Sequence, residues 1–186
     1  DDGGYIDNFY KAFNSLDCKT SHIDFFKRTI NLEAHIMNQD IIFVGGGNTK
    51  SMLAVWKDWG LDKILRTAYR NGVVMSGVSA GAICWFQQGV TDSWSSDLKI
   101  MSCLNFVKGT CCPHYDEEPE RKPAVKKFLM SGKIKDVYAV DGGVALHIRD
   151  EKDFKSVVFR KDKGSYRTFV EKKEIVEKKF RKILLI

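Results

Sequence analysis

The sequence lacks any apolar run that approaches the roughly 20 residues of a membrane-spanning helix. No signal peptide is recognisable at its start. Its five cysteines are odd in number and none forms a C-x-x-C pair, so neither a disulfide framework nor a zinc site is indicated. We therefore expect a cytoplasmic protein with no membrane partner, no metal and no other cofactor.

Two phosphate-binding patterns are also missing. The glycine-rich stretch Gly45–Thr49 lacks the Gly-Lys-Ser/Thr order of a phosphate loop, and it does not complete a G-x-G-x-x-G dinucleotide fingerprint. The net charge of +6 would suit nucleic acid, but residues 151–186 account for all of it, with twelve Lys and Arg against six Asp and Glu. Because acids interrupt this basic tail and no nucleic-acid motif accompanies it, we expect no nucleic-acid partner.

The length and composition fit one globular domain. The chain has 186 residues, of which 44% are hydrophobic and 29% charged. It has no initiator methionine and opens on two aspartates and two glycines, an odd place for a fold to begin. We therefore expect a single domain over residues 1–186 that lacks an N-terminal segment.

Apolar runs and helical periodicity alternate along the first half of the chain. Alternation of this kind is typical of a parallel α/β sheet with right-handed crossovers. In the second half, alternating apolar residues predict an antiparallel meander after residue 144. The predicted helices are 5–16, 32–37, 52–56, 61–69, 80–86 and 121–130, and the predicted strands are 21–26, 40–44, 73–75, 106–115, 137–140, 144–148, 157–159 and 166–170.

The segment Gly77–Gly81 has the G-x-S-x-G pattern of a nucleophile elbow, between a predicted strand and a predicted helix. So sharp a turn strains the backbone of the serine, and only glycine-like residues on either side let the chain pass. Ser79 is therefore a candidate nucleophile. It would lie at the positive end of the following helix, where a developing oxyanion is stabilised.

The glycine-rich stretch follows the neighbouring predicted strand, and Thr49 is expected to cap the helix after it. Ligands collect at the carboxyl ends of strands in open α/β sheets, so both loops should meet at one rim. The amides of Gly47 and Ala80 would then form a two-donor oxyanion hole.

A histidine and an acid follow later strands. His114 comes directly after Pro113 at the end of a predicted strand, and we favour it as the general base among the four histidines. Asp141 ends the predicted strand 137–140, before two glycines, where its carboxylate would hold the imidazole in the tautomer that accepts the serine proton. A turn acid before a hairpin accounts for Asp141 equally well.

Three stretches together resemble one family. Ile41–Thr49, Gly77–Ala82 and Pro113–Tyr115 occur in the order and approximate spacing of peptidase E, the aspartyl dipeptidase, and its cyanophycinase-like relatives. The resemblance implies a three-layer α/β/α sandwich with a mostly parallel sheet, class I glutamine-amidotransferase-like and flavodoxin-like, with antiparallel C-terminal strands. It also implies a Ser-His-acid peptidase that cleaves dipeptides with an N-terminal aspartate, without metal or cofactor.

The same resemblance suggests residues for substrate binding. Arg121 falls near an arginine linked to recognition of the acidic side chain of the substrate, a role that suits a bidentate guanidinium. A basic surface helix explains Arg121 equally well. Asn48, which belongs to the first of the three stretches, is assigned to the substrate in the same way.

The family commonly has glutamate where this chain has Asp141, which leaves Asp92 as a second candidate for the third catalytic member. A small peptide is the expected substrate. Two alternatives stay open: an esterase or acyltransferase that uses the same serine elbow, and an inactive relative that binds a ligand at the same rim. The sequence carries no signature of an oligomeric state.

Overall fold

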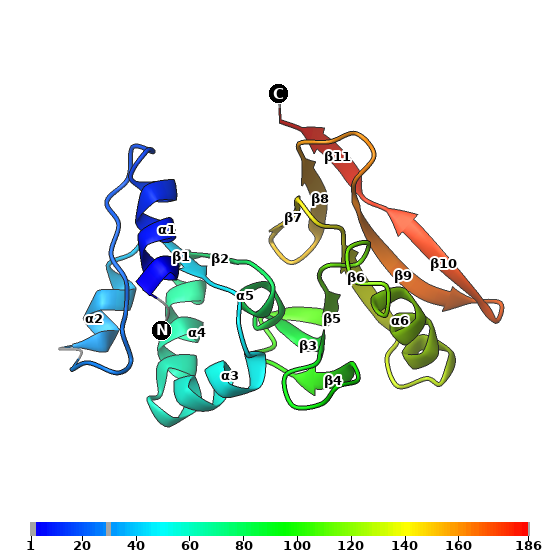
Figure 1. Cartoon of the computed structure of the whole chain (residues 1–186), viewed down its shortest axis with the longest axis horizontal. Coiled ribbons are helices and arrows are strands. Elements are labelled where there is room, and N and C mark those ends of the chain that lie inside the picture. Colours follow the sequence, from blue (N-terminus) through cyan, green and yellow to red (C-terminus); the bar gives the residue numbers. More distant parts are fainter. Residues whose placement is uncertain (1–2, 29–30, 186) are drawn as a thin grey trace. The chain divides into compact units, whose positions relative to one another are not determined.

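The structure, a computed structural model, describes residues 3–28 and 31–185. The chain divides into two compact units, Asp1–His35 and Ile36–Ile186 (Figure 1). Within the described ranges, no helix is long and apolar enough to cross a membrane. The organisation as a single domain stays a prediction.

The first unit contains helix α1 (Gly3–Phe13), which confirms the amphipathic helix expected there. The strand expected at residues 21–26 is wrong, because this segment is irregular. The carboxylate of Asp24 accepts a hydrogen bond from the amide of Phe26 at 2.9 Å and folds the chain into a turn. Helix α2 (Leu32–Met37) then leads into the second unit.

The second unit begins with a two-stranded parallel sheet that carries the serine elbow. Strand β1 (Ile41–Val44) pairs with β2 (Val74–Gly77) so that Val44 lies opposite Gly77, the first residue of the elbow. Helices α3 (Thr49–Asp58) and α4 (Leu61–Arg70) connect the two strands. Parallel pairing of β1 and β2 brings the carboxyl ends of both strands to one edge, as the sequence predicted.

The helix predicted at residues 80–86 is much shorter in the structure. Helix α5 (Ala80–Ile83) is a single turn, and strand β3 (Phe86–Thr91) begins where the predicted helix ends. Partners distant in the sequence decide this boundary, because the carbonyl of Trp85 accepts a hydrogen bond from the amide of Phe106 at 2.8 Å. A one-turn helix offers little macrodipole, so any oxyanion must rely on individual amides.

The remaining strands are β4 (Lys99–Ser102), β5 (Val107–Cys112), β6 (Asp136–Val140), β7 (Val144–Arg149), β8 (Asp153–Val158), β9 (Ser165–Glu171), β10 (Glu174–Lys179) and β11 (Arg181–Leu184). A six-stranded sheet has the order β10-β9-β6-β5-β3-β4, and a three-stranded sheet has the order β11-β8-β7. Parallel and antiparallel pairs are equally frequent among the described strands, so the fold is mixed α/β rather than mostly parallel. Helix α6 (Arg121–Met130) packs on β9 and β10, with bounds as predicted.

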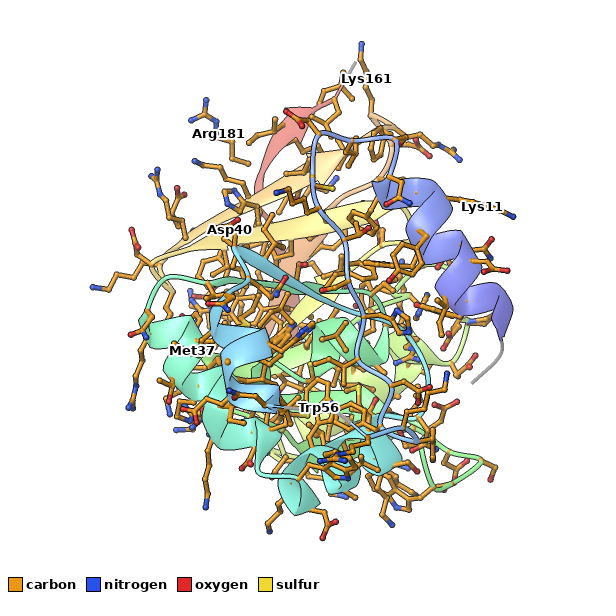
Figure 2. All side chains as sticks on the ribbon, turned by 90° about the vertical axis from the view of Figure 1, so that its left-hand side faces the viewer. Lys11, Met37, Asp40, Trp56, Lys161 and Arg181 are labelled. Atoms are coloured by element: carbon orange, nitrogen blue, oxygen red, sulfur yellow. The ribbon has the colours of Figure 1, made fainter. Side chains whose placement is uncertain are left out.

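Buried aromatic side chains connect the helices of the second unit to its strands. Trp56 of α3 is only 6% exposed, and its ring lies 6.2 Å from that of Trp85. Figure 2 shows Trp56 among packed side chains, whereas Lys161 and Arg181 of the basic tail project outward. The indole of Trp85 also donates a hydrogen bond to the carbonyl of Ser76, which fixes β2 behind the elbow.

Candidate active site

The backbone of Ser79 is strained in the way that a nucleophile elbow requires. Its φ of 54° and ψ of −116° lie in a sparsely populated region for a residue with a side chain. Hydrogen bonds on both sides hold this conformation: the amide of Val78 donates to the carbonyl of Val44 at 3.0 Å, and the amide of Gly81 donates to the carbonyl of Val78 at 2.9 Å. Strain of this kind costs roughly 1–3 kcal/mol and persists only where the surrounding structure imposes it.

The two glycines of the elbow are required by space. A Cβ atom on Gly81 would lie 2.1 Å from the carbonyl oxygen of Val44, and one on Gly77 would lie 2.3 Å from the carbonyl oxygen of Gly81. These neighbours are main-chain atoms, which cannot move aside as a flexible side chain can. The sequence interpretation, that the chain passes only where the residues two places before and after Ser79 have no bulky side chain, is therefore confirmed.

The glycine-rich loop lies directly beside the serine. A Cβ atom on Gly46 would stand 3.5 Å from the Cβ of Ser79. The next residue, Gly47, has a φ of 140°. In the described part of the chain, neither the amide of Gly47 nor that of Ala80 donates a hydrogen bond, so both are available to a ligand. Whether they form the predicted oxyanion hole stays a prediction, although their loops lie together.

His114 follows β5 in a tight turn, with a φ of 54°. The amide of Tyr115 donates to the carbonyl of Val140 at 3.0 Å, which ties this turn to the end of β6. The ring atom Nδ1 of His114 lies 2.9 Å from Oε2 of Glu117. Among the described residues, the ring and the hydroxyl of Ser79 share no hydrogen bond. The structure therefore pairs the imidazole with a carboxylate from its own turn.

Asp141, the acid that we expected to orient His114, has other partners. It is 6% exposed, and its Oδ2 accepts hydrogen bonds from the amide of Gly164 and the hydroxyl of Tyr166, each at 3.0 Å. Burial raises the pKa of Asp141, and burial and this hydrogen bond raise the pKa of Tyr166 to about 12. The antiparallel pairing of β6 with β9 explains these contacts, because it places Val140 opposite Ser165.

Arg121 is turned into the protein. It is 4% exposed, and its guanidinium donates to the carboxylate of Glu118 at 2.7 Å and to the carbonyl of Val90 at 2.9 Å. Burial by itself would lower the pKa of Arg121, but the bond to Glu118 raises it. These hydrogen bonds connect α6 to the end of β3. In this structure the guanidinium is therefore buried and does not face the solvent from which a substrate would come.

The side chain of Asn48 caps α3, the role that we expected of Thr49. Its carbonyl oxygen accepts from the amide of Ser51 at 2.9 Å, and its amide nitrogen donates to the carbonyl of Ser93 at 2.6 Å. Asp92 is exposed, and its carboxylate makes no hydrogen bond within residues 3–28 and 31–185. Neither residue makes a hydrogen bond to His114 in that part of the chain.

Most of the chain, including the serine elbow and His114, matches one protein-family model. Residues 1–155 match the model of peptidase family S51. The chain belongs to peptidase family S51. It is accordingly a serine-type peptidase, and the strained serine of the elbow agrees with this membership. In the described part of the chain, no three His, Cys, Asp or Glu side chains gather so that they could hold a metal ion.

Relatives support the assignment to family S51. The chain is 47% identical over 183 residues to the uncharacterized peptidase YgaJ of Bacillus subtilis (strain 168), covering 95% of this chain and 77% of that one. It is 29% identical over 130 residues to peptidase E of Pasteurella multocida (strain Pm70), or 62% of this chain and 53% of the relative. A crystal structure of a candidate peptidase E from Listeria monocytogenes EGD-e has the same fold, with a TM-score of 0.60 at 21% identity over 95% of this chain and 78% of that one.

Glu117, whose carboxylate contacts His114, is a residue that the sequence analysis did not single out. The sequence feature that could have indicated Glu117 is its position three residues after His114. At this spacing a carboxylate in a tight turn can reach the imidazole ring. Asp116 and Glu118 flank it, however, and the sequence does not distinguish the three acids. In the structure Asp116 pairs with Lys163 and Glu118 with Arg121, so that Glu117 alone of the three contacts the histidine.

The hydrogen bonds of Asp141 predict that this residue stabilises the folded protein. We expect Asp141→Ala to lower the free energy of unfolding by about 1–3 kcal/mol, because it leaves the amide of Gly164 and the hydroxyl of Tyr166 without their acceptor. Asp141→Asn should cost less, since one amide oxygen can accept both hydrogen bonds. Urea unfolding of the two variants at pH 7 measures the difference, and equal losses in both would contradict these contacts.

The raised pKa of Asp141 also predicts a dependence on pH. The folded state disfavours the ionised carboxyl, so the wild-type protein loses stability as pH rises from about 3.9, the ordinary value of an aspartate, through the higher value in the folded state. Asp141→Asn has no such loss. Its stability relative to wild type should therefore increase between pH 3 and pH 7, and a constant difference across this range would contradict the expectation.

Proposed function

We propose that this S51 peptidase hydrolyses small peptides, chiefly dipeptides with an N-terminal aspartate, with Ser79 as nucleophile and His114 as general base. The strained backbone of Ser79 is the observation that carries the proposal. The fold imposes this conformation on a residue whose hydroxyl has no hydrogen-bond partner among the described residues and whose turn lies beside the glycine-rich loop. A purely structural turn would place glycine there.

The proposed reaction proceeds by acyl transfer. The Oγ of Ser79 attacks the carbonyl carbon of the scissile peptide bond while its proton passes to Nε2 of His114. The amides of Gly47 and Ala80 donate to the oxyanion, and each such donor contributes about 3 kcal/mol in related enzymes. His114 then returns the proton to the leaving amine, and the same residue deprotonates the water that hydrolyses the acyl-enzyme.

We propose that the hydrogen bond between Ser79 and His114 forms when the substrate binds. Catalytic hydrogen bonds of enzymes without ligand are often long and tighten only when substrate is bound. Helix α5, which begins directly after Ser79, contacts β5, the strand that ends before His114. This contact supports the proposal because it connects the elbow with the strand that carries the base.

We also infer the three-layer α/β/α sandwich of the class I glutamine-amidotransferase-like, flavodoxin-like kind. Helix α5 contacts β1 and β2 as well as β3 and β5, so one element packs against strands of both the two-stranded and the six-stranded sheet. Similarity to peptidase E supports the aspartyl preference. Because the guanidinium of Arg121 donates to Glu118 and to the carbonyl of Val90, we propose that another cation recognises the substrate carboxylate.

A panel of Xaa-Leu dipeptides tests the proposed function. We expect kcat/KM for Asp-Leu to exceed that for Asn-Leu, Glu-Leu and Ala-Leu by about tenfold or more, since a site built for a short carboxylate discriminates against its analogues. Release of free leucine is the readout. Hydrolysis of p-nitrophenyl acetate in preference to every aspartyl peptide would instead indicate an esterase and contradict the proposal.

A further inference from the structure

The carboxylate of Glu117 occupies the place of the acid in a catalytic triad. Its Oε2 lies 2.9 Å from Nδ1 of His114, and the side chains are 51% and 29% exposed, respectively. A carboxylate at this position accepts a hydrogen bond from the Nδ1–H group of the ring and so leaves the lone pair of Nε2 for the serine hydroxyl. No other carboxylate makes a hydrogen bond to His114 in the part of the chain that the structure describes.

The loop after β6 leaves room for this carboxylate at Gly142. A Cβ atom on Gly142 would lie 2.0 Å from both Cδ and Oε1 of Glu117 and 2.6 Å from its Oε2. Gly142 does not have a positive φ, and the three atoms nearest to its Cβ position all belong to the carboxylate of Glu117, so this carboxylate is what a side chain there would meet.

A further contact fixes this loop against the turn that carries His114. The amide of Gly142 donates to Oδ1 of Asp116 at 2.8 Å, and Lys163 forms an ion pair with the same carboxylate. Burial by itself would raise the pKa of Asp116, but the bonds to Lys163 and Gly142 together lower it. Position 142 therefore cannot readily move away from Glu117.

We propose that Glu117 is the residue that positions His114, and that Gly142 is required because any side chain there displaces the Glu117 carboxylate from the ring. The proposal rests on the proposed function, since it assigns the acid of the Ser79–His114 mechanism. It replaces Asp141 and Asp92 in that role. The acid thus comes from the turn of the histidine itself, three residues along the chain, instead of from the next strand.

Single variants test the role of Glu117. We expect Glu117→Ala to lower kcat by about 10²-fold or more with KM changed by less than about twofold, because a wrong imidazole tautomer slows proton transfer without loss of substrate contacts. Glu120→Ala is the matched control. Glu120 is exposed in the same segment and its side chain makes no cap hydrogen bond, so this variant should retain wild-type kcat. Wild-type kcat in Glu117→Ala would overturn the proposal.

A double-mutant cycle separates this role from a general effect on the fold. Gly142→Ala should lower kcat nearly as much as Glu117→Ala, because the new methyl group occupies the position of the carboxylate. In the Glu117→Ala background, the same change should alter kcat by less than about twofold, since nothing remains to be displaced. Equal losses from Gly142→Ala in both backgrounds would overturn the proposed link between the two positions.

Labelling with a fluorophosphonate distinguishes failure of this inference from failure of the proposed function. If wild-type Ser79 is labelled and Glu117→Ala is labelled at the wild-type rate, the positioning role fails while the serine mechanism stands. If the folded wild-type protein is neither labelled at Ser79 nor active on any dipeptide, both proposals are overturned. The predicted result is labelling of Ser79 that slows by about 10²-fold or more in Glu117→Ala and does not slow in Glu120→Ala.

Discussion

We expect Ser79→Ala to lower kcat for peptide hydrolysis by about 10⁴-fold or more, the largest effect of any single change in this protein, because it removes the nucleophile. The fold should survive. Alanine has the same backbone restrictions as serine, so the strain at φ 54° is unchanged, and no hydrogen bond of the Ser79 hydroxyl to a described residue is lost. Rates on Asp-Leu, with circular dichroism to verify folding, measure the effect.

Ser76 provides the matched control for this prediction. It lies on β2, three residues before Ser79, and its hydroxyl donates to the carbonyl of Ile42 at 3.0 Å. Ser76→Ala should lose about 1 kcal/mol of stability and retain activity within a fewfold of wild type. Comparable activity of Ser79→Ala and Ser76→Ala would reject Ser79 as the nucleophile.

The second large effect concerns stability. We expect Gly81→Ala to lower the free energy of unfolding by about 3 kcal/mol or more, because its methyl group would lie 2.1 Å from the carbonyl oxygen of Val44 and 2.7 Å from that of Gly45. Relief of this clash requires β1 and the elbow to separate. Activity should be lost together with stability, since the elbow geometry of Ser79 depends on the same contact.

Gly132→Ala is the control for the backbone contribution. Gly132 has a φ of 70° and nothing within 4 Å of its Cβ position, so alanine there should cost only about 1 kcal/mol. The difference between the two variants in urea unfolding isolates the steric term at Gly81. If both variants lost the same free energy of unfolding, the close approach of Gly81 to the carbonyl of Val44 would be contradicted.

Local patterns predicted the elements that place the nucleophile. The glycine spacing of Gly77–Gly81 and the apolar run before it are short-range signals, and both correspond to features of the structure. Helix α6 has the predicted bounds for the same reason, because its periodicity lies within the segment. The predicted helix 80–86 failed at its end, where the pairing of Phe86 with Val107 in a distant strand overrides the local apolar pattern.

The surroundings of the histidine were harder to predict, since they depend on pairing between distant strands. Asp141 stands at a strand end, as a triad acid would, but the pairing of β6 with β9 brings it Gly164 and Tyr166 as partners. Arg121 likewise belongs to a helix that is basic in sequence, yet its guanidinium is buried by Glu118 and the end of β3. The sequence shows which polar residues are present, but the tertiary structure determines their hydrogen-bond and ion-pair partners.

The most direct test of the central claim is a peptide map of the wild-type protein after reaction with a fluorophosphonate. We expect one modified residue, Ser79, because only a serine activated by a neighbouring base and flanked by available amides attacks phosphorus at a useful rate. His114→Ala should abolish the modification without unfolding the protein. A folded, unmodified Ser79, or equal labelling of Ser79 in His114→Ala, would contradict the account.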